Sequence, residues 1–157
     1  MKKVEISVLM SEIFIINEWL WSDSNGDNGI QKQKEAFSFL ETLCKRCDRI
    51  AVAKGSRFQR KALDFSRNAG ESADVIKRGI ARLYFHKIIF NSLKYEEVDI
   101  EGNEVVLEGI NPDDAYLVKT HYKTKAPIIT TDNKLMTFLQ PKNIPCKLRD
   151  AFLKEYL

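Results

Sequence analysis

The feature that most constrains the fold is the alternation of short apolar segments with longer amphipathic ones along the 157 residues. Each apolar segment has the length of one buried strand, and each amphipathic segment has helical spacing. Strands that alternate with helices usually pair in parallel within one sheet. The sequence therefore predicts an α/β domain around a mostly parallel sheet.

The predicted elements follow the chain in this order. Strands are expected at residues 2–8, 49–53, 127–130 and 144–148. Helices are expected after the first strand as far as Trp21, and at 31–47, 56–68, about 72–93, 111–125, 132–139 and the carboxyl end. Residues 95–109 alternate in polarity around a turn at Gly102-Asn103, which favours a hairpin or a strand with a polar lead-in.

Composition limits the protein to one ordinary domain, residues 1–157. Hydrophobic residues make up 44% of the chain and charged residues 30%, which is typical of a globular protein. Because no apolar run approaches the length of a membrane span and no export signal is evident, we expect a cytoplasmic protein without a membrane partner. The net charge of +3 permits an anionic partner without demanding one.

Carboxylates recur where predicted strands end or helices begin. Asp132 follows the strand in "APIITTDNKL", Asp113 and Asp114 open the helix in "NPDDAYLV", and Glu5 ends the first predicted strand. Each position taken alone is explained by helix capping or by the helix dipole. Parallel strands bring their carboxyl ends to one sheet edge, however, so these groups are expected to converge there. Clustered carboxylates suit Mg²⁺ or Mn²⁺, which could act on a phosphodiester.

These residues resemble a known family. "GINPDDAYLVKTHYKTKAPIITTDNKL" resembles the carboxyl-terminal half of PIN domains, which are metal-dependent nucleases, with an acidic "DDA" helix start and a strand closing on "TxD". "VEISVLMSEIF" is similar to the opening of the family, with Glu5 in place of Asp. The resemblance extends from about residue 3 to 147. It implies a PIN-like, three-layer α/β/α sandwich with a central, mostly parallel sheet.

The resemblance also implies a function, a metal-dependent endoribonuclease. Glu5, Asp114 and Asp132 would bind Mg²⁺ or Mn²⁺, Asp113 would assist, and Thr131 would orient a carboxylate or the attacking water. RNA would be the substrate, in a toxin-like or RNA-processing role. Frequent homodimers and an antitoxin-like protein partner are further implications.

The sequence departs from the family pattern at two acidic positions. If the family's opening motif is aligned in another register, Met10 stands at the first acidic position. Glu12, two residues further on, is then the possible substitute for Glu5. The second acid would come from the helix after the second strand, where the chain has Gln59 or Arg60. Asp64, Glu71 and Asp74 lie further along. These departures support an alternative, a catalytically impaired PIN-like module that binds RNA or a protein partner.

Basic residues concentrate in two helical stretches. If they border the acidic edge, the residues expected to contact an RNA backbone are Arg57, Arg60, Lys61, Lys77 and Arg78. The structural alternative is a solvated helix face.

The chain has three cysteines, two of which form a CxxC at Cys44 and Cys47. A redox or zinc site built on this pair is a third hypothesis, but ligands at zinc spacing are lacking elsewhere. The pair falls late in an amphipathic helix, which predicts small core residues. The sequence leaves open whether one of them forms a disulfide with Cys146.

Overall fold

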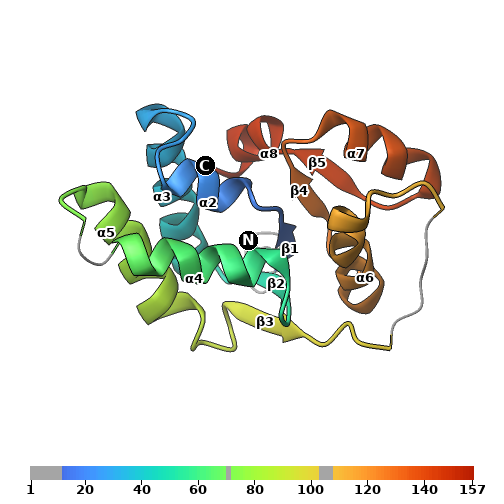
Figure 1. Cartoon of the computed structure of the whole chain (residues 1–157), viewed down its shortest axis with the longest axis horizontal. Helices are drawn as coiled ribbons and strands as arrows, with labels where there is room; N and C mark the ends of the chain where they lie inside the picture. The colour runs from blue at the N-terminus through green and yellow to red at the C-terminus, as the bar shows by residue number, and fades with distance from the viewer. Residues whose placement is uncertain (1–11, 70–71, 103–107) are drawn as a thin grey trace, which may run out of the picture.

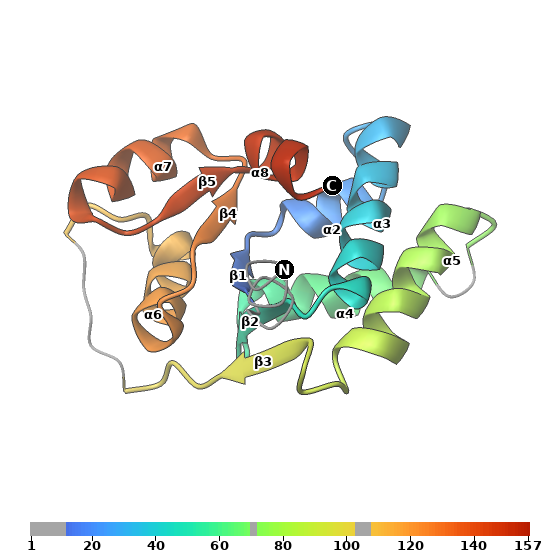
Figure 2. The same ribbon diagram turned by 180° about the vertical axis from the view of Figure 1, so that it is seen from behind.

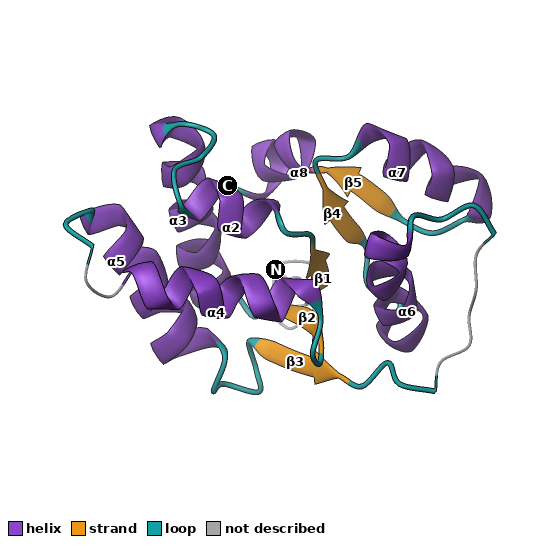
Figure 3. Ribbon diagram, in the orientation of Figure 1, coloured by secondary structure: helices purple, strands orange, loops and turns teal. Residues whose placement is uncertain are grey.

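The computed structural model describes residues 12–69, 72–102 and 108–157. Within them, five strands form one all-parallel sheet in the order β3-β2-β1-β4-β5. The strands are β1 (Ile13–Ile16), β2 (Arg49–Ala53), β3 (Tyr95–Val98), β4 (Ile128–Thr130) and β5 (Cys146–Leu148). Figure 3 shows these strands between the helices. The predicted α/β class with a parallel sheet is confirmed.

Helices connect successive strands of the sheet, and the last helix follows β5. They are α2 (Trp19–Ser24), α3 (Ile30–Lys45), α4 (Arg57–Ala69), α5 (Val75–Arg82), α6 (Ala115–Thr124), α7 (Asn133–Leu139) and α8 (Arg149–Tyr156). A π-helical turn, η1 (Leu83–Ile88), extends α5, and short 3₁₀ turns are η2 (Pro112–Asp114) and η3 (Gln140–Lys142).

Alternate residues of the central strand β1 face two separate cores, as the period of a strand requires. Phe14 and Ile16 join the core beneath α2, α3, α4, α5 and α8. Ile15 faces the other core, which α6 and α7 close. Figure 1 and, from behind, Figure 2 show the two groups of helices on opposite sides of the sheet. The sheet is therefore the middle layer of a three-layer α/β/α sandwich.

One predicted boundary is wrong. The strand expected at residues 2–8 lies outside the described residues, and the helix expected to reach Trp21 does not cover Ile13–Ile16, which form β1. Three isoleucines and a phenylalanine in a row favour a strand that is buried on both faces. Apolar residues continue into α2, which is why the segment has the composition of one buried helix. The helix itself starts at Trp19.

Two other predicted elements have a more detailed form. The long helix expected at 72–93 begins at Val75, where Asp74 caps it by accepting from the N–H groups of Ile76 and Lys77, and becomes π-helical from Leu83. Within 95–109 the strand is β3, parallel to β2. The rest of the expected hairpin falls partly on residues 103–107, outside the described ranges. No helix in the described part of the chain is long and apolar enough to cross a membrane.

A buried arginine ties three helices together. Arg149, at the start of α8, is 2% exposed, and its Nε donates to Oδ2 of Asp23 at 2.7 Å. Its other nitrogens donate to Glu35 of α3 at 3.1 Å and to Asp150 at 2.6 Å. Asp23 of α2 is itself 1% exposed and accepts a second bond from Asn28. Charges this deeply buried persist because each has a paired, hydrogen-bonded partner.

Candidate active site

The ends of β1 and β4 meet side by side because Ile16 pairs with Ile129 in parallel register. Asn17 directly follows β1, and its Nδ2 donates to the Thr130 hydroxyl at 3.0 Å. The same hydroxyl, which is fully buried, accepts from the N–H of Asp132 at 3.1 Å. Thr130 therefore fixes both strand ends in one position, with Asp132 beside Asn17.

Asp132 is the N-cap of α7, as its "TDN" context predicted. Its Oδ1 accepts from the N–H groups of Lys134 at 2.9 Å and Leu135 at 3.2 Å. Among the described residues, none hydrogen-bonds to the second oxygen, Oδ2. One oxygen of this half-buried carboxylate therefore holds the helix, while the other stays available to a ligand.

Asp113 and Asp114 sit where α6 begins. Asn111 caps the turn, as predicted, by accepting from the N–H of Asp113 at 3.0 Å. The Asp113 carboxylate is exposed, whereas Asp114 is half-buried. Burial raises the pKa of Asp114 above its ordinary value of 3.8, and the charges of Asp132, Glu18 and Asp113 raise it further. The carboxylates of three separate chain segments therefore repel one another here.

These groups line one open hollow of ≈ 440 Å³, which we call the acidic hollow. The lining residues that matter for its chemistry are Asn17, Glu18, Arg57, Asp113, Asp114, Thr131 and Asp132. Asp23 also reaches the wall, but both of its oxygens are occupied by Arg149 and Asn28. The structure thus brings together four of the predicted catalytic residues, Asp113, Asp114, Thr131 and Asp132, with one predicted RNA-binding residue, Arg57.

Tyr116 of α6 forms a hydrogen bond to a residue that lines the acidic hollow. Burial raises its pKa well above that of an ordinary tyrosine, and the charges of Glu18 and Asp114 add to the effect. The hydroxyl donates to Oδ1 of Asn17 at 3.4 Å. That bond orients the Asn17 amide, whose Nδ2 holds Thr130.

One positively charged side chain, Arg57 of α4, also lines the acidic hollow. Nε of Arg57 lies 3.0 Å from Oε1 of Glu18, and its Nη1 lies 3.0 Å from Oδ2 of Asp113. These two carboxylates raise the pKa of Arg57, with Glu18 contributing most. Arg57 thus offsets part of the negative charge that the other residues gather.

None of the described candidates for the second acid reaches the acidic hollow. Gln59 accepts from the N–H of Gly55 at 2.7 Å and donates towards β3. Asp64 lies exposed beside Arg67 at 3.8 Å, and Asp74 caps α5. Glu71 lies outside the described residues. Arg60 is exposed and lines a different hollow, which leaves α4 without a carboxylate at this edge.

The two candidates for the first acid have different outcomes. Glu5 lies outside the described residues. Glu12 precedes β1, so it stands at the opposite edge of the sheet, roughly 16 Å of strand from Asn17. The register that makes Glu12 the first acid is therefore wrong. Asn17 and Glu18 lie at the carboxyl end of β1 and line the acidic hollow. Their signal in the sequence was a polar pair after the apolar run "IFII", comparable to the polar residues that follow "PII" before Asp132.

Four of the five predicted RNA-binding residues line two further hollows. Arg57, Arg60 and Lys61 line a hollow of ≈ 330 Å³ along α4, which we call the basic hollow. Arg78 lines another, of ≈ 340 Å³, together with Arg82 and His86. Lys77 lies half-buried near Asp74 and lines neither.

The cysteines contribute little to the case for a redox or zinc site. Cys44 is half-buried and packs against the larger core, as predicted. The prediction is wrong for Cys47, which is exposed because α3 ends at Lys45. All three thiols are free, so the disulfide left open with Cys146 is not formed.

Comparison with known proteins assigns no family. No family model matches the chain, and neither a curated protein nor a solved structure matches it. The resemblance to PIN domains therefore stays a prediction from the sequence, and the function has to be argued from the geometry of the acidic hollow.

Proposed function

We propose that this protein is a metal-dependent endoribonuclease that cleaves RNA phosphodiester bonds at the acidic hollow. The observation that carries the proposal is the convergence of Asp113, Asp114, Asp132 and Glu18 on one hollow at the carboxyl ends of β1 and β4. Burial and the charges of its neighbours raise the pKa of Asp114 there, as expected where carboxylates repel one another. A divalent cation would relieve this repulsion. The location fits as well, since open parallel sheets bind ligands at the carboxyl ends of their strands.

The donor set suits Mg²⁺ or Mn²⁺ with water and phosphate completing the coordination shell. Among the residues described, no three of His, Cys, Asp and Glu are arranged to hold a metal ion together. Mg²⁺ does not need such a cage, since one or two carboxylates with waters and substrate phosphates usually hold it. Asp114 and the free Oδ2 of Asp132 would be its protein ligands. When bound, the cation would supply Lewis acidity and lower the pKa of a coordinated water.

The other residues have roles around the substrate. Arg57 would turn from its carboxylate partners to a phosphate oxygen, because its planar guanidinium matches either group. Thr130, through Asn17 and the Asp132 backbone, keeps the carboxylate at a fixed distance from β1. RNA as the substrate follows from the resemblance of the sequence to PIN domains. The basic hollow, which Arg57 also lines, supports this choice because its positive charge would attract a polyanion.

The first test is calorimetric titration with Mn²⁺. Asp132→Asn should abolish detectable Mn²⁺ binding while the fold stays intact, because asparagine is as good an N-cap as aspartate. The matched control is Asp64→Asn, which removes an exposed carboxylate outside the acidic hollow and should bind Mn²⁺ like the wild type. Wild-type protein that binds no Mn²⁺ would overturn the proposal.

Mn²⁺ binding should weaken on acidification earlier than it would at ordinary carboxylates. The pKa of Asp114 is raised, so this ligand takes up a proton at a higher pH than an isolated aspartate and then competes with the cation. Affinity is expected to be full near neutral pH and to fall as the pH drops through the raised pKa. Titrations between about pH 7 and about pH 4 would measure this. Asp114→Asn should bind weakly throughout and lack the inflection.

A second candidate function is the catalytically impaired module that binds RNA or a protein partner. The ion pairs of Arg57 with Glu18 and Asp113 favour it, since a resident side chain then offsets charge that a metal would otherwise offset. In that module the acidic hollow would be stable without a cation, and RNA would bind without being cleaved.

Arg57→Gln separates these functions. Under the nuclease proposal, loss of Arg57 frees two carboxylates and removes a competing cation, so Mn²⁺ should bind more tightly while RNA binds more weakly. Arg60→Gln is the matched control, because it removes the same charge from an exposed position outside the acidic hollow. It should weaken RNA binding and leave Mn²⁺ affinity nearly unchanged. If neither variant alters Mn²⁺ affinity, Arg57 does not compete with a cation.

A further inference from the structure

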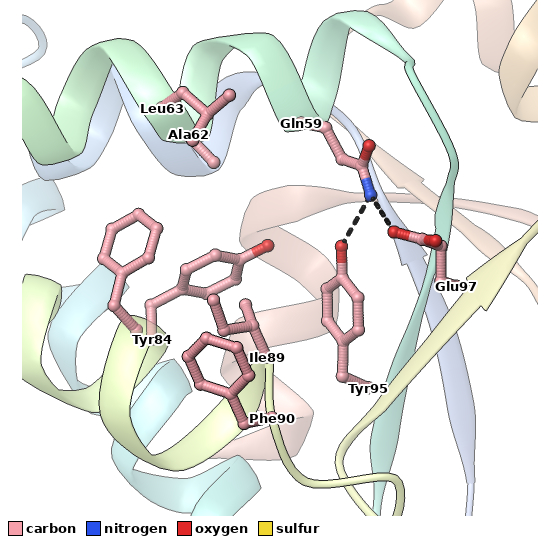
Figure 4. Close-up of a pocket in the computed structure, with 9 residues that line it drawn as sticks. Gln59, Ala62, Leu63, Tyr84, Ile89, Phe90, Tyr95 and Glu97 are labelled. Atoms are coloured by element: carbon pink, nitrogen blue, oxygen red, sulfur yellow. Dashed lines mark hydrogen bonds between the residues drawn. The ribbon is translucent and has the colours of Figure 1, made fainter.

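A further pocket lies between α4, η1 and β3, away from the acidic hollow. It encloses ≈ 280 Å³ and has aromatic walls, formed by Tyr84, Phe85, Phe90 and Tyr95. Gln59 and Glu97 form its polar end, as Figure 4 shows. We call this the aromatic pocket. Its size and flat aromatic sides suit one planar ring system.

Phe90 is the most unusual wall of the aromatic pocket. Its side chain is 84% exposed, although a phenylalanine gains most when it is buried. It follows η1, so it projects from a structured helix end and not from a long loop. An exposed aromatic beside an open pocket can stack on an incoming ring without further rearrangement.

The polar end of the aromatic pocket retains hydrogen-bonding capacity. Nε2 of Gln59 donates to the Tyr95 hydroxyl at 3.0 Å and to Oε2 of Glu97 at 2.7 Å. Within the described chain, no hydrogen bond reaches Oε1 of Glu97. A carboxylate so placed accepts from ring N–H and amino groups. Guanine presents two such donors side by side, whereas uracil flanks its one donor with carbonyl oxygens that a carboxylate repels.

Basic surfaces flank the aromatic pocket on two sides. Leu63 lines both the aromatic pocket and the basic hollow, where Arg60, Lys61 and Arg67 lie with one carboxylate, Asp64. Phe85 lines both the aromatic pocket and the hollow of Arg78, Arg82 and His86. Aromatic platforms bordered by cationic side chains are the usual means of binding single-stranded nucleic acid.

The basic hollow also connects the aromatic pocket to the acidic hollow. Arg57 lines both the basic and the acidic hollow, and Leu63 lines both the basic hollow and the aromatic pocket. The two residues are six positions apart on α4, which is about 9 Å along the helix axis. A short stretch of extended single-stranded nucleic acid spans that distance.

We propose that the aromatic pocket is a subsite for one base, with guanine preferred, of a single-stranded RNA whose backbone lies along the basic hollow. The identity of the polymer rests on the proposed function, but base binding itself needs no metal. Stacking on Phe90 supplies affinity, Glu97 supplies the preference, and α4 directs the strand towards the acidic hollow.

The test is fluorescence anisotropy in EDTA with a short labelled oligouridine that carries one central guanosine, so that the RNA stays intact. Phe90→Ala should weaken binding about tenfold or more, as expected for a lost stacking platform. Leu93→Ala is the matched control, because Leu93 is also an exposed apolar residue, 73% exposed, but does not line the pocket. It should bind like the wild type.

Glu97→Gln tests the preference for guanine. It should reduce the ratio of affinities for the guanosine-containing and the all-uridine oligomer, even though loss of a negative charge raises affinity for both. The proposal is overturned if Phe90→Ala and Leu93→Ala bind RNA equally well, or if the wild type binds no RNA. It is also overturned if Phe90→Ala leaves RNA affinity unchanged but dissociates a dimer in light scattering, since the pocket would then hold a protein.

These outcomes are separate from those of the metal site. Asp132→Asn should bind RNA in EDTA at least as tightly as the wild type, since it removes a negative charge, and Phe90→Ala should bind Mn²⁺ like the wild type. A failure of Mn²⁺ binding would remove the nuclease proposal and leave the base subsite standing. A failure of RNA binding in EDTA would remove the base subsite and leave the proposal of a metal site standing.

Discussion

Replacing Arg149 with methionine should lower the free energy of unfolding by about 3–5 kcal/mol, the usual cost of removing one partner from a buried ion pair. Arg149 and Asp23 are 2% and 1% exposed, and their atoms approach to 2.7 Å. Methionine fills most of the volume but leaves the Asp23 carboxylate buried with Asn28 as its remaining partner. The destabilisation therefore comes from an uncompensated charge and not from a cavity.

Urea unfolding followed by circular dichroism would measure the change. Lys45→Met is the control, because it breaks an exposed ion pair within α3, with Glu41 at 3.7 Å, and should cost less than about 1 kcal/mol. The double variant Asp23→Leu/Arg149→Met should recover part of the loss, since apolar replacement of a whole buried pair is often tolerated. Equal stability of Arg149→Met and Lys45→Met would contradict this prediction.

The sequence predicted those parts of the fold whose signals are local. β2 falls on its predicted residues, and the N-caps Asn111 and Asp132 act as their residue types and positions predicted. These features depend on a few neighbouring residues, so pattern and propensity suffice. The convergence of Asp114 and Asp132 was predicted from one general rule, that parallel strands bring their carboxyl ends to the same sheet edge.

The missed features depend on contacts between distant segments. The strand Ile13–Ile16 and the helix after it are both apolar, so the hydrophobic pattern does not show where the strand ends and the helix begins. These residues form a strand because they pair with β2 and β4. The ion pairs of Arg57 join α4 to residues 39 and 56 positions away. The aromatic pocket likewise combines α4, η1 and β3. No local pattern in the sequence encodes these combinations.

Asp132→Asn should reduce Mn²⁺-dependent cleavage of RNA by at least about 100-fold. Loss of a residue that merely supports a metal ligand already costs up to about 100-fold, and Asp132 is proposed as a ligand itself. The variant is informative because the asparagine side-chain oxygen can still accept from the N–H groups of Lys134 and Leu135, so α7 keeps its cap. Unchanged circular dichroism and melting temperature would verify this.

Cleavage would be followed with labelled RNA in Mn²⁺, with EDTA and the Asp64→Asn variant as controls. Asp64→Asn should cleave like the wild type, because its carboxylate lies on the exposed side of α4. If Asp132→Asn cleaved as fast as the wild type, the activity would arise outside the acidic hollow. If the wild type bound RNA and did not cleave it, the missing carboxylate on α4 and the Arg57 ion pairs would be decisive, and the impaired binding module would be the better account. Only loss in Asp132→Asn together with retention in Asp64→Asn supports the nuclease, since general effects of removing a negative charge would affect both variants alike.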